Sequence, residues 1–247
     1  SEPKRTSNEL LKYFLMAERG ENGEFDPHRV PKYSRGKESR SRGKRMQILE
    51  FCDQVTTNSN QIMMSGLAEI PDLGMLAVAE KQGMIEVINV QSLERVKLIK
   101  AHNTEICCIL YVPEKKLLLS ADANGLINVW DCQGDFKFVR AFAKHTKAVL
   151  ALEYFPDQEL VVSGGDDECI RMWSIKTFKE EQTMRTKQSK IGSLCRLGNS
   201  KIAVGFDKGV INVIAFEPER KVTLSFPAHN KHILSLKYLE ESNILIW

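Results

Sequence analysis

The sequence predicts an all-β fold in which short strands repeat as a radial array of similar units. A repeat period, runs of strand length within each period, and turn residues between those runs all point to this class. In the third period the apolar segments "AVLALEYF", "LVVSGG" and "CIRMWSI" are separated by a Pro-Asp turn and an acidic turn. Strands of about five to seven residues at this spacing are typical of repeated antiparallel sheets.

The repeat is clearest where two consecutive segments align without a gap. His102 precedes Trp130 by 28 residues, and His145 precedes Trp173 by the same interval. The same frame gives repeat starts at 60, 102, 145, 187 and 229, a period of 42 or 43 residues. The last repeat stops at "NILIW", within its second strand. Four repeats and part of a fifth are therefore expected.

The recurring His and Trp are the landmark residues of the repeat, and two of the repeats lack both. Asn60 and Lys187 stand at the His position, and Ile88 and Ile214 replace the Trp. Their turns "EKQG" and "FDKG" still end in glycine, which tolerates a positive φ. We expect the same sheets here, held by apolar packing and backbone hydrogen bonds.

The pattern of His, 28 residues and then Trp-Asp or Trp-Ser resembles the WD-repeat family of β-propellers, from about Asn60 to the end of the chain. This resemblance implies a hydrogen-bonded chain of a loop His, a strand Ser, a turn acid and a strand Trp. The matching residues in the third and second repeats are His145, Ser163, Asp167, Trp173, His102, Ser120, Asn124 and Trp130. Because such propellers commonly have about seven blades, we expect a fragment of a seven-bladed or larger propeller.

A catalytic interpretation competes with this structural one, since Ser163, His145 and Asp167 are the residue types of a hydrolase triad. Ser163, however, lies within "VVSGG" on an apolar strand and has no GxSxG nucleophile turn. Trp can bury its ring and still donate its indole N–H. We therefore expect a structural network, and no catalytic, cofactor or metal site.

Composition limits the class of protein without identifying it. The 247 residues carry a net charge of +3, with 43% hydrophobic and 27% charged residues, as in ordinary globular proteins. The N-terminus "SEPKRTSNEL" has neither an initiating Met nor a signal peptide, and no apolar run is long enough to span a bilayer. We expect an intracellular protein whose sequence lacks its true start. The sequence does not distinguish between the cytoplasm, the cilium or cytoskeleton, and the nucleus. No CxxC pair is present, so reduced, mostly buried thiols are expected.

Residues 1–50 do not follow the repeat, which we assign to residues 51–247. Thr6 and Glu9 have capping-box spacing, which predicts an amphipathic helix at about 7–19. The helix either packs against its own propeller or docks a partner.

The segment 29–45 is strongly basic, with a local net charge of +7 and almost no apolar residues. It is expected to be either a solvated linker or a tether that contacts phosphates, acidic protein tails or anionic surfaces through charge. Its basic residues are Arg29, Lys32, Arg35, Lys37, Arg40, Arg42, Lys44 and Arg45.

The resemblance implies a rigid platform that binds several proteins. We expect a non-catalytic scaffold of a large intracellular assembly, either ciliary or cytoskeletal, or ribonucleoprotein. Two alternatives stay open: an RNA- or DNA-associated factor that uses the basic segment, and a regulatory propeller of a longer multidomain chain. The candidates for partner contact, on the face where the landmark His and acidic turns lie, are Asn103, Glu105, Lys147, Asp166, Lys231 and His232.

Overall fold

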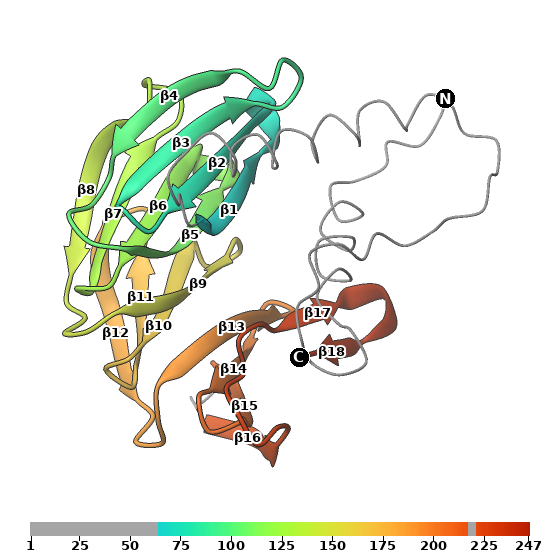
Figure 1. Cartoon of the computed structure of the whole chain (residues 1–247). Helices are drawn as coiled ribbons and strands as arrows, with labels where there is room; N and C mark the ends of the chain where they lie inside the picture. Colours follow the sequence, from blue (N-terminus) through green and yellow to red (C-terminus); the bar gives the residue numbers. More distant parts are fainter. Residues whose placement is uncertain (1–63, 217–220) are drawn as a thin grey trace, which may run out of the picture. The chain divides into compact units, whose positions relative to one another are not determined.

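Successive antiparallel sheets make up the fold in a computed structural model that describes residues 64–216 and 221–247 (Figure 1). Four sheets have four strands each, and a fifth has two. In every four-stranded sheet the strands pair in chain order, as a meander. The predicted all-β fold of four repeats and part of a fifth is thus confirmed. The predicted helix at 7–19 and the basic segment 29–45 lie outside the described residues.

The strands have similar lengths from sheet to sheet. The first sheet comprises β1 (Met64–Ile70), β2 (Met75–Glu80), β3 (Met84–Asn89) and β4 (Arg95–Lys100). The second comprises β5 (Ile106–Val112), β6 (Leu117–Asp122), β7 (Leu126–Asp131) and β8 (Lys137–Ala143). The third comprises β9 (Val149–Phe155), β10 (Leu160–Gly165), β11 (Cys169–Ser174) and β12 (Lys179–Arg185). The fourth comprises β13 (Ile191–Leu197), β14 (Lys201–Phe206), β15 (Val210–Ala215) and β16 (Lys221–Pro227), and the fifth β17 (Lys237–Leu239) and β18 (Ile244–Ile246).

Short 3₁₀ turns connect the first two strands of three sheets: η1 (Pro71–Leu73), η2 (Pro113–Lys115) and η3 (Glu240–Ser242). Proline begins the first two of these turns, where its fixed φ suits the helical conformation. Each turn ends in a left-handed residue, Gly74, Lys116 or Asn243, whose N–H donates to the carbonyl of the first turn residue. These turns reverse the chain at the edge opposite the loops described below.

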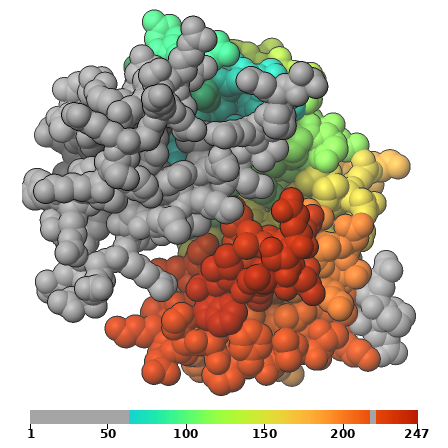
Figure 2. Space-filling model, turned by 90° about the vertical axis from the view of Figure 1, so that its right-hand side faces the viewer, coloured from blue at the N-terminus to red at the C-terminus, as the bar shows by residue number. Residues whose placement is uncertain are grey.

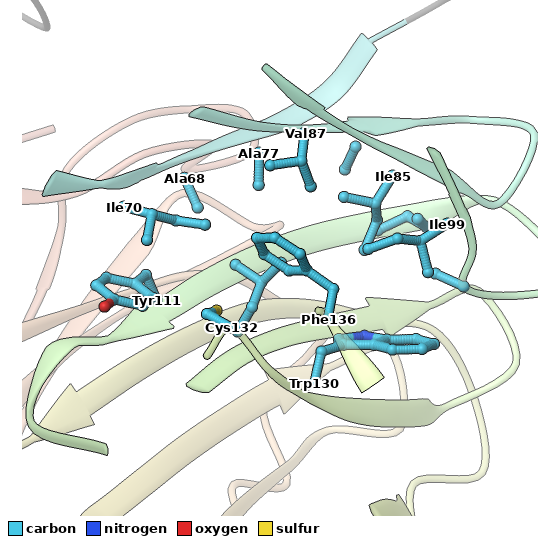
Figure 3. Close-up of a cluster of buried hydrophobic side chains, with 14 residues drawn as sticks. Ala68, Ile70, Ala77, Ile85, Val87, Ile99, Tyr111, Trp130, Cys132 and Phe136 are labelled. Carbon is cyan, nitrogen blue, oxygen red and sulfur yellow. The ribbon is translucent and has the colours of Figure 1, made fainter. Parts of the chain in front are cut away.

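The core lies between successive sheets. The first strand of each sheet packs beside the first strand of the next, from β1 through β5, β9 and β13 to β17. Figure 3 shows one such layer, in which Ile70 and Ile85 of the first sheet face Trp130 and Phe136 of the second. Every residue of β6 is buried, because its sheet is covered on both faces.

The two repeats without landmarks are packed as the sequence predicts. Ile88 and Ile214 stand in place of the Trp and are almost fully buried. Lys187, at the His position, is exposed and has a positive φ of 54°. In these repeats apolar contact replaces the polar network described below.

The fifth sheet covers part of the fourth. Figure 2 shows the red atoms of the fifth sheet directly against the orange atoms of the fourth. Ile233 and Leu236, which precede β17, are buried in one cluster with Cys195 and Ala203 of the fourth sheet. The two sheets therefore share an apolar core, as the earlier pairs of sheets do.

Candidate partner-binding face

One edge of the sheets carries both the loops that lead into each first strand and the turns between second and third strands. In the second to fourth sheets, backbone hydrogen bonds fasten the loop to the turn of the same sheet, as from Ala123 N–H to Glu105 O at 3.0 Å and from Asp166 N–H to Ala148 O at 2.9 Å. Asp207 N–H donates to Lys190 O at 3.0 Å in the same way. We call this edge the loop face; its loops are 101–105, 144–148, 186–190 and 228–232, and its turns are 81–83, 123–125, 166–168 and 207–209.

A continuous chain of hydrogen bonds lies beneath the loop face in the third sheet. The indole Nε1–H of Trp173 donates to Ser163 Oγ at 2.8 Å, and Ser163 Oγ lies 2.8 Å from Nε2 of His145. Nδ1 of the same imidazole lies 2.9 Å from each carboxylate oxygen of Asp167. Asp167 also accepts the backbone N–H groups of Thr146 and Cys169. The chain thus connects strand β11, strand β10, the loop and the turn.

Of the two ionisable groups in this hydrogen-bond chain, His145 is neutral and Asp167 is charged. Burial lowers the pKa of His145 and outweighs the opposing effect of Asp167, so the imidazole is neutral. Burial alone would raise the pKa of Asp167, but its hydrogen bonds from His145 and from the backbone leave it lowered, so the carboxylate is charged. A neutral imidazole donates through Nδ1–H to Asp167 and accepts the Ser163 hydroxyl at Nε2. Each polar group then has a partner.

The distances match those of a hydrolase triad, but the surroundings differ. Ser163 is 0% exposed, so no substrate carbonyl can approach its Oγ. Its oxygen already accepts the Trp173 indole N–H, and the hydroxyl lies within a strand paired on both sides. An activated nucleophile needs an open face next to oxyanion donors. This geometry therefore suits a buried brace.

The second sheet repeats most of this chain. Trp130 Nε1–H donates to Ser120 Oγ at 3.0 Å, and His102 Nε2 lies 2.8 Å from the same oxygen. The aromatic neighbours of the two Trp residues differ, because Phe142 of the second sheet packs flat on Trp173 of the third, whereas Phe138 meets Trp130 edge-on within the second sheet. The two expected Trp–Ser–His contacts thus recur with small differences in packing.

The acid of the second sheet is a different residue from the expected one. The expectation placed Asn124 beside His102, but Asn124 is exposed, and Asp122 Oδ2 lies 3.2 Å from Nδ1 of His102. The contact is too oblique for a hydrogen bond, so Nδ1 has none among the described residues. Asp122 Oδ1 accepts the backbone N–H groups of Asn124 and Leu126, and Oδ2 accepts the Thr104 hydroxyl.

The reason for this substitution is the residue at the end of the second strand. Gly165 occupies that position in the third sheet and has no side chain, so the turn residue Asp167 reaches the imidazole. In the second sheet Asp122 ends β6 and is itself buried against the imidazole. Asn124 is left on the surface of the turn.

The six partner-contact candidates all belong to loop-face segments. Asn103, Lys147, Lys231 and His232 are exposed, whereas Glu105 and Asp166 are half-buried in ion pairs. Lys81 contacts Glu105 at 3.3 Å, and Lys190 contacts Asp166 at 2.9 Å. The charges on this face are mixed in sign, which suits a protein surface better than a polyanion.

Sequence reasoning missed several residues on the loop face. An open hollow of about 300 Å³ is lined by Leu150, Asp166, Lys190, Gly192, Asp207, His232 and Leu234. Only Asp166 and His232 of this set were among the candidates. The turn "FDKG" aligns Asp207 with Asp166, which was a usable signal. No pattern in the sequence indicated that Gly192 would open a hollow.

Residues 64–216 and 221–247 hold no group of three or more His, Cys, Asp or Glu side chains placed to bind a metal ion. Over the same ranges, no helix has the length and apolar character needed to span a bilayer. The five described cysteines are free, and burial raises the pKa of Cys195 to about 11, which keeps that thiol protonated.

Family comparison agrees with this geometry. Residues 93–131 and 136–174 match the family described as "WD domain, G-beta repeat". Each matched segment includes one full His–Ser–Trp set and ends just after its Trp. The chain is a WD40-repeat protein. Its four-stranded sheets are therefore WD40 propeller blades, and the two unmatched sheets are blades whose landmark residues have been replaced.

This WD40 chain is similar to several curated proteins whose names describe different roles. It is 28% identical over 114 residues to polyadenylation factor subunit 2 of Candida albicans, covering 46% of this chain and 21% of that protein. It is 27% identical over 173 residues to protein groucho of Drosophila melanogaster, covering 68% and 23%. It is 23% identical over 176 residues to the probable coatomer subunit beta' of Schizosaccharomyces pombe, covering 70% and 22%. The chain spans about a fifth of the length of these relatives.

Among solved structures, a chain in "Crystal Structure of Mitotic Checkpoint Complex" is similar, with a TM-score of 0.64 and 21% sequence identity. The similarity covers 70% of this chain and 57% of that one. At this identity the likeness supports the shared propeller fold alone.

Proposed function

We propose that this WD40 chain is a non-catalytic scaffold whose loop face binds other proteins of a large intracellular assembly. The observation that carries the proposal is the contrast between the buried network and the surface above it. The Ser–His–Asp set is fully occupied in bracing the loop 144–148, from which Lys147 projects, and the His102–Ser120 pair braces the loop that carries Asn103. Lys231 and His232 project from the loop 228–232, which backbone hydrogen bonds from Ala228 and His229 hold to Gly209. Rigid loops bind partners with little loss of conformational entropy.

The names of two relatives support a role in an assembly. Both are named as subunits, one of a polyadenylation factor and one of coatomer. Their identities below 30% leave open which assembly this chain joins. Ciliary or cytoskeletal and ribonucleoprotein assemblies are the two classes that we propose.

Co-purification from the native cell tests this role. The double variant Lys147→Glu with Lys231→Glu reverses two exposed loop-face charges that form no ion pair among the described residues. The matched control, Lys137→Glu with Lys176→Glu, makes the same change at two exposed residues of the opposite edge. We expect the loop-face variant to lose partners that the control retains. Equal recovery of every partner by both variants would refute a loop-face scaffold.

The basic segment 29–45 favours a second contribution, an electrostatic tether to an acidic or phosphate-bearing surface. Six of its basic residues, replaced by Gln, test this: Arg35, Lys37, Arg40, Arg42, Lys44 and Arg45. The variant should keep the fold and recover less of the assembly at low salt, and its recovery should fall less steeply than that of the unmodified chain as salt is raised, because it has fewer charges for salt to screen. Unchanged recovery at every salt concentration would make the segment a solvated linker. Loss of the tether after nuclease treatment would identify RNA or DNA as the surface.

A further inference from the structure

The hollow on the loop face is lined by a glycine, Gly192, that stands between two leucines. The apolar segments "VLA", "IGS" and "ILS" lead into the third, fourth and fifth sheets. Their second residues are Leu150, Gly192 and Leu234. Leucine stands at this position on either side of Gly192, and all three residues line the hollow. Glycine is required here by close packing, because a Cβ would lie 2.7 Å from the carbonyl oxygen of Ile233. The result is a depression between two leucines.

The polar rim of the hollow carries an uncompensated negative charge. Lys190 is paired with Asp166 at 2.9 Å, and this hydrogen bond raises the pKa of the lysine. Asp207 stands one sheet further along, at the position equivalent to Asp166, but its carboxylate forms no hydrogen bond or ion pair with any described residue. The lining thus holds two carboxylates, Asp166 and Asp207, against the one ammonium of Lys190.

The carboxylate of Asp207 has no hydrogen-bond partner among the described residues. The residue is half-buried, and its Oδ1 is fully enclosed without a partner. A carboxylate oxygen removed from water without a hydrogen bond destabilises the protein that holds it. A positively charged donor that enters the hollow would give this carboxylate a partner at Oδ2, the oxygen that is not enclosed. Such a donor would have an apolar stem in contact with the leucines and a cationic head at Asp207.

We propose that this hollow binds a basic side chain, Arg or Lys, presented by a protein partner. Long basic side chains pack their methylene groups on apolar surface while the charged head stays polar, which matches leucine walls and an acidic rim. A guanidinium group also suits a half-buried carboxylate because it is weakly hydrated. The two carboxylates would repel a phosphate backbone, so a protein segment is the occupant and not a nucleic acid. The inference rests on the proposed partner-binding role of the loop face and specifies the chemistry recognised there.

The test uses the full chain and a synthetic peptide as probe. The peptide is a terminally blocked segment of Gly, Ser and Ala with one central Arg, and its control carries citrulline, which has nearly the same shape without the charge. Binding is followed by NMR of ¹³C-labelled leucine methyl groups. We expect the Arg peptide to shift the methyl signals of Leu150 and Leu234 in a saturable manner, and the citrulline peptide to bind at least about tenfold more weakly.

Two variants connect the binding to the hollow. Asp207→Asn should weaken the Arg peptide about tenfold or more, since a hydrogen bond to a charged group is lost in part. Asp157→Asn is the matched control, because Asp157 is exposed in a turn of the opposite edge. Leu234→Ser removes a wall of the hollow at a residue that is 82% exposed, so it should weaken binding without unfolding the sheet. Both results support the proposal.

Three outcomes would overturn it. These are equal binding of the Arg and citrulline peptides, equal affinity of the Asp207→Asn and Asp157→Asn variants, or no shift at Leu150 and Leu234 at millimolar peptide. The scaffold role fails separately. If the Lys147→Glu, Lys231→Glu variant loses its native partners but the Arg peptide does not bind the hollow, the scaffold role is supported and this inference is wrong. If the peptide binds the hollow but every loop-face variant keeps its partners, the scaffold role falls.

Discussion

The indole Nε1 of Trp173 lies 2.8 Å from Oγ of Ser163, and both side chains are buried between sheets. This contact ties the third strand of the blade to the second. Through His145 and Asp167 it continues to the loop and the turn of the loop face. Buried polar atoms of the blade are thus linked by hydrogen bonds to its exposed loop face.

Removal of the ring should destabilise the blade strongly. Trp173→Ala deletes a side chain that stacks on Phe142 with ring centroids 4.7 Å apart, and it leaves Ser163 without its donor. We expect a loss of about 3 to 5 kcal/mol in the free energy of unfolding. Chemical denaturation measures it. Trp247→Ala is the control, since Trp247 is 44% exposed and should cost far less.

A smaller change separates the ring from its hydrogen bond. Trp173→Phe keeps an aromatic ring next to Phe142 but removes the indole N–H. It should cost about 1 to 3 kcal/mol, most of it from the unsatisfied Ser163 oxygen and the lost ring volume. A cost equal to that of Trp173→Ala would show that packing and not the polar chain carries the stability.

Acid should destabilise the protein from about neutral pH downward. Burial lowers the pKa of both His145 and His102 below the value of 6.5 that histidine has in an unfolded chain. Between the folded and unfolded pKa values the unfolded state binds more protons, so stability is fully present above pH 6.5 and falls as pH falls below it. Asp167, whose pKa is also lowered, adds a further loss below its unfolded value of 3.8. Melting temperatures from pH 8 to pH 5 check the sign, and a rise in melting temperature toward pH 5 would contradict it.

The two candidates for the acid position of the second blade, Asp122 and Asn124, should differ in their effects on stability. Asp122→Ala removes the acceptor of two backbone N–H groups and of the Thr104 hydroxyl, and it should cost about 1 to 3 kcal/mol. Asn124→Ala changes an exposed turn residue and should stay within about 0.5 kcal/mol. Thermal unfolding of the two variants decides between them. A larger cost for Asn124 would restore the assignment made from repeat alignment.

Repeat spacing was enough to predict the blades, because strand length and turn placement follow from residues close in sequence. The hydrogen-bonded chain from Trp173 to Asp167 was implied by the resemblance to the WD-repeat family, and repeat spacing alone did not predict it. Repeat alignment failed at Asn124 because it compares positions and cannot see that Asp122, two residues earlier, reaches the same imidazole. The hollow around Gly192 was also missed, because it depends on how three sheets meet.

Ser163 should be chemically inert in the folded protein. Its hydroxyl is enclosed and bonded, so a serine-reactive fluorophosphonate probe should leave it unmodified. Mass spectrometry of the labelled protein locates any adduct. Stoichiometric modification of Ser163 under native conditions would overturn the non-catalytic account.

The most direct test of the scaffold account is hydrogen exchange of the chain alone and in complex with its co-purified partner. The account predicts slower exchange on binding at amides of the loops 101–105, 144–148, 186–190 and 228–232. Turns of the opposite edge, such as those that begin at Pro113 and Pro156, should be unchanged. Protection confined to that opposite edge or to the outer strands β4, β8, β12 and β16, with none at the loop face, would contradict the account.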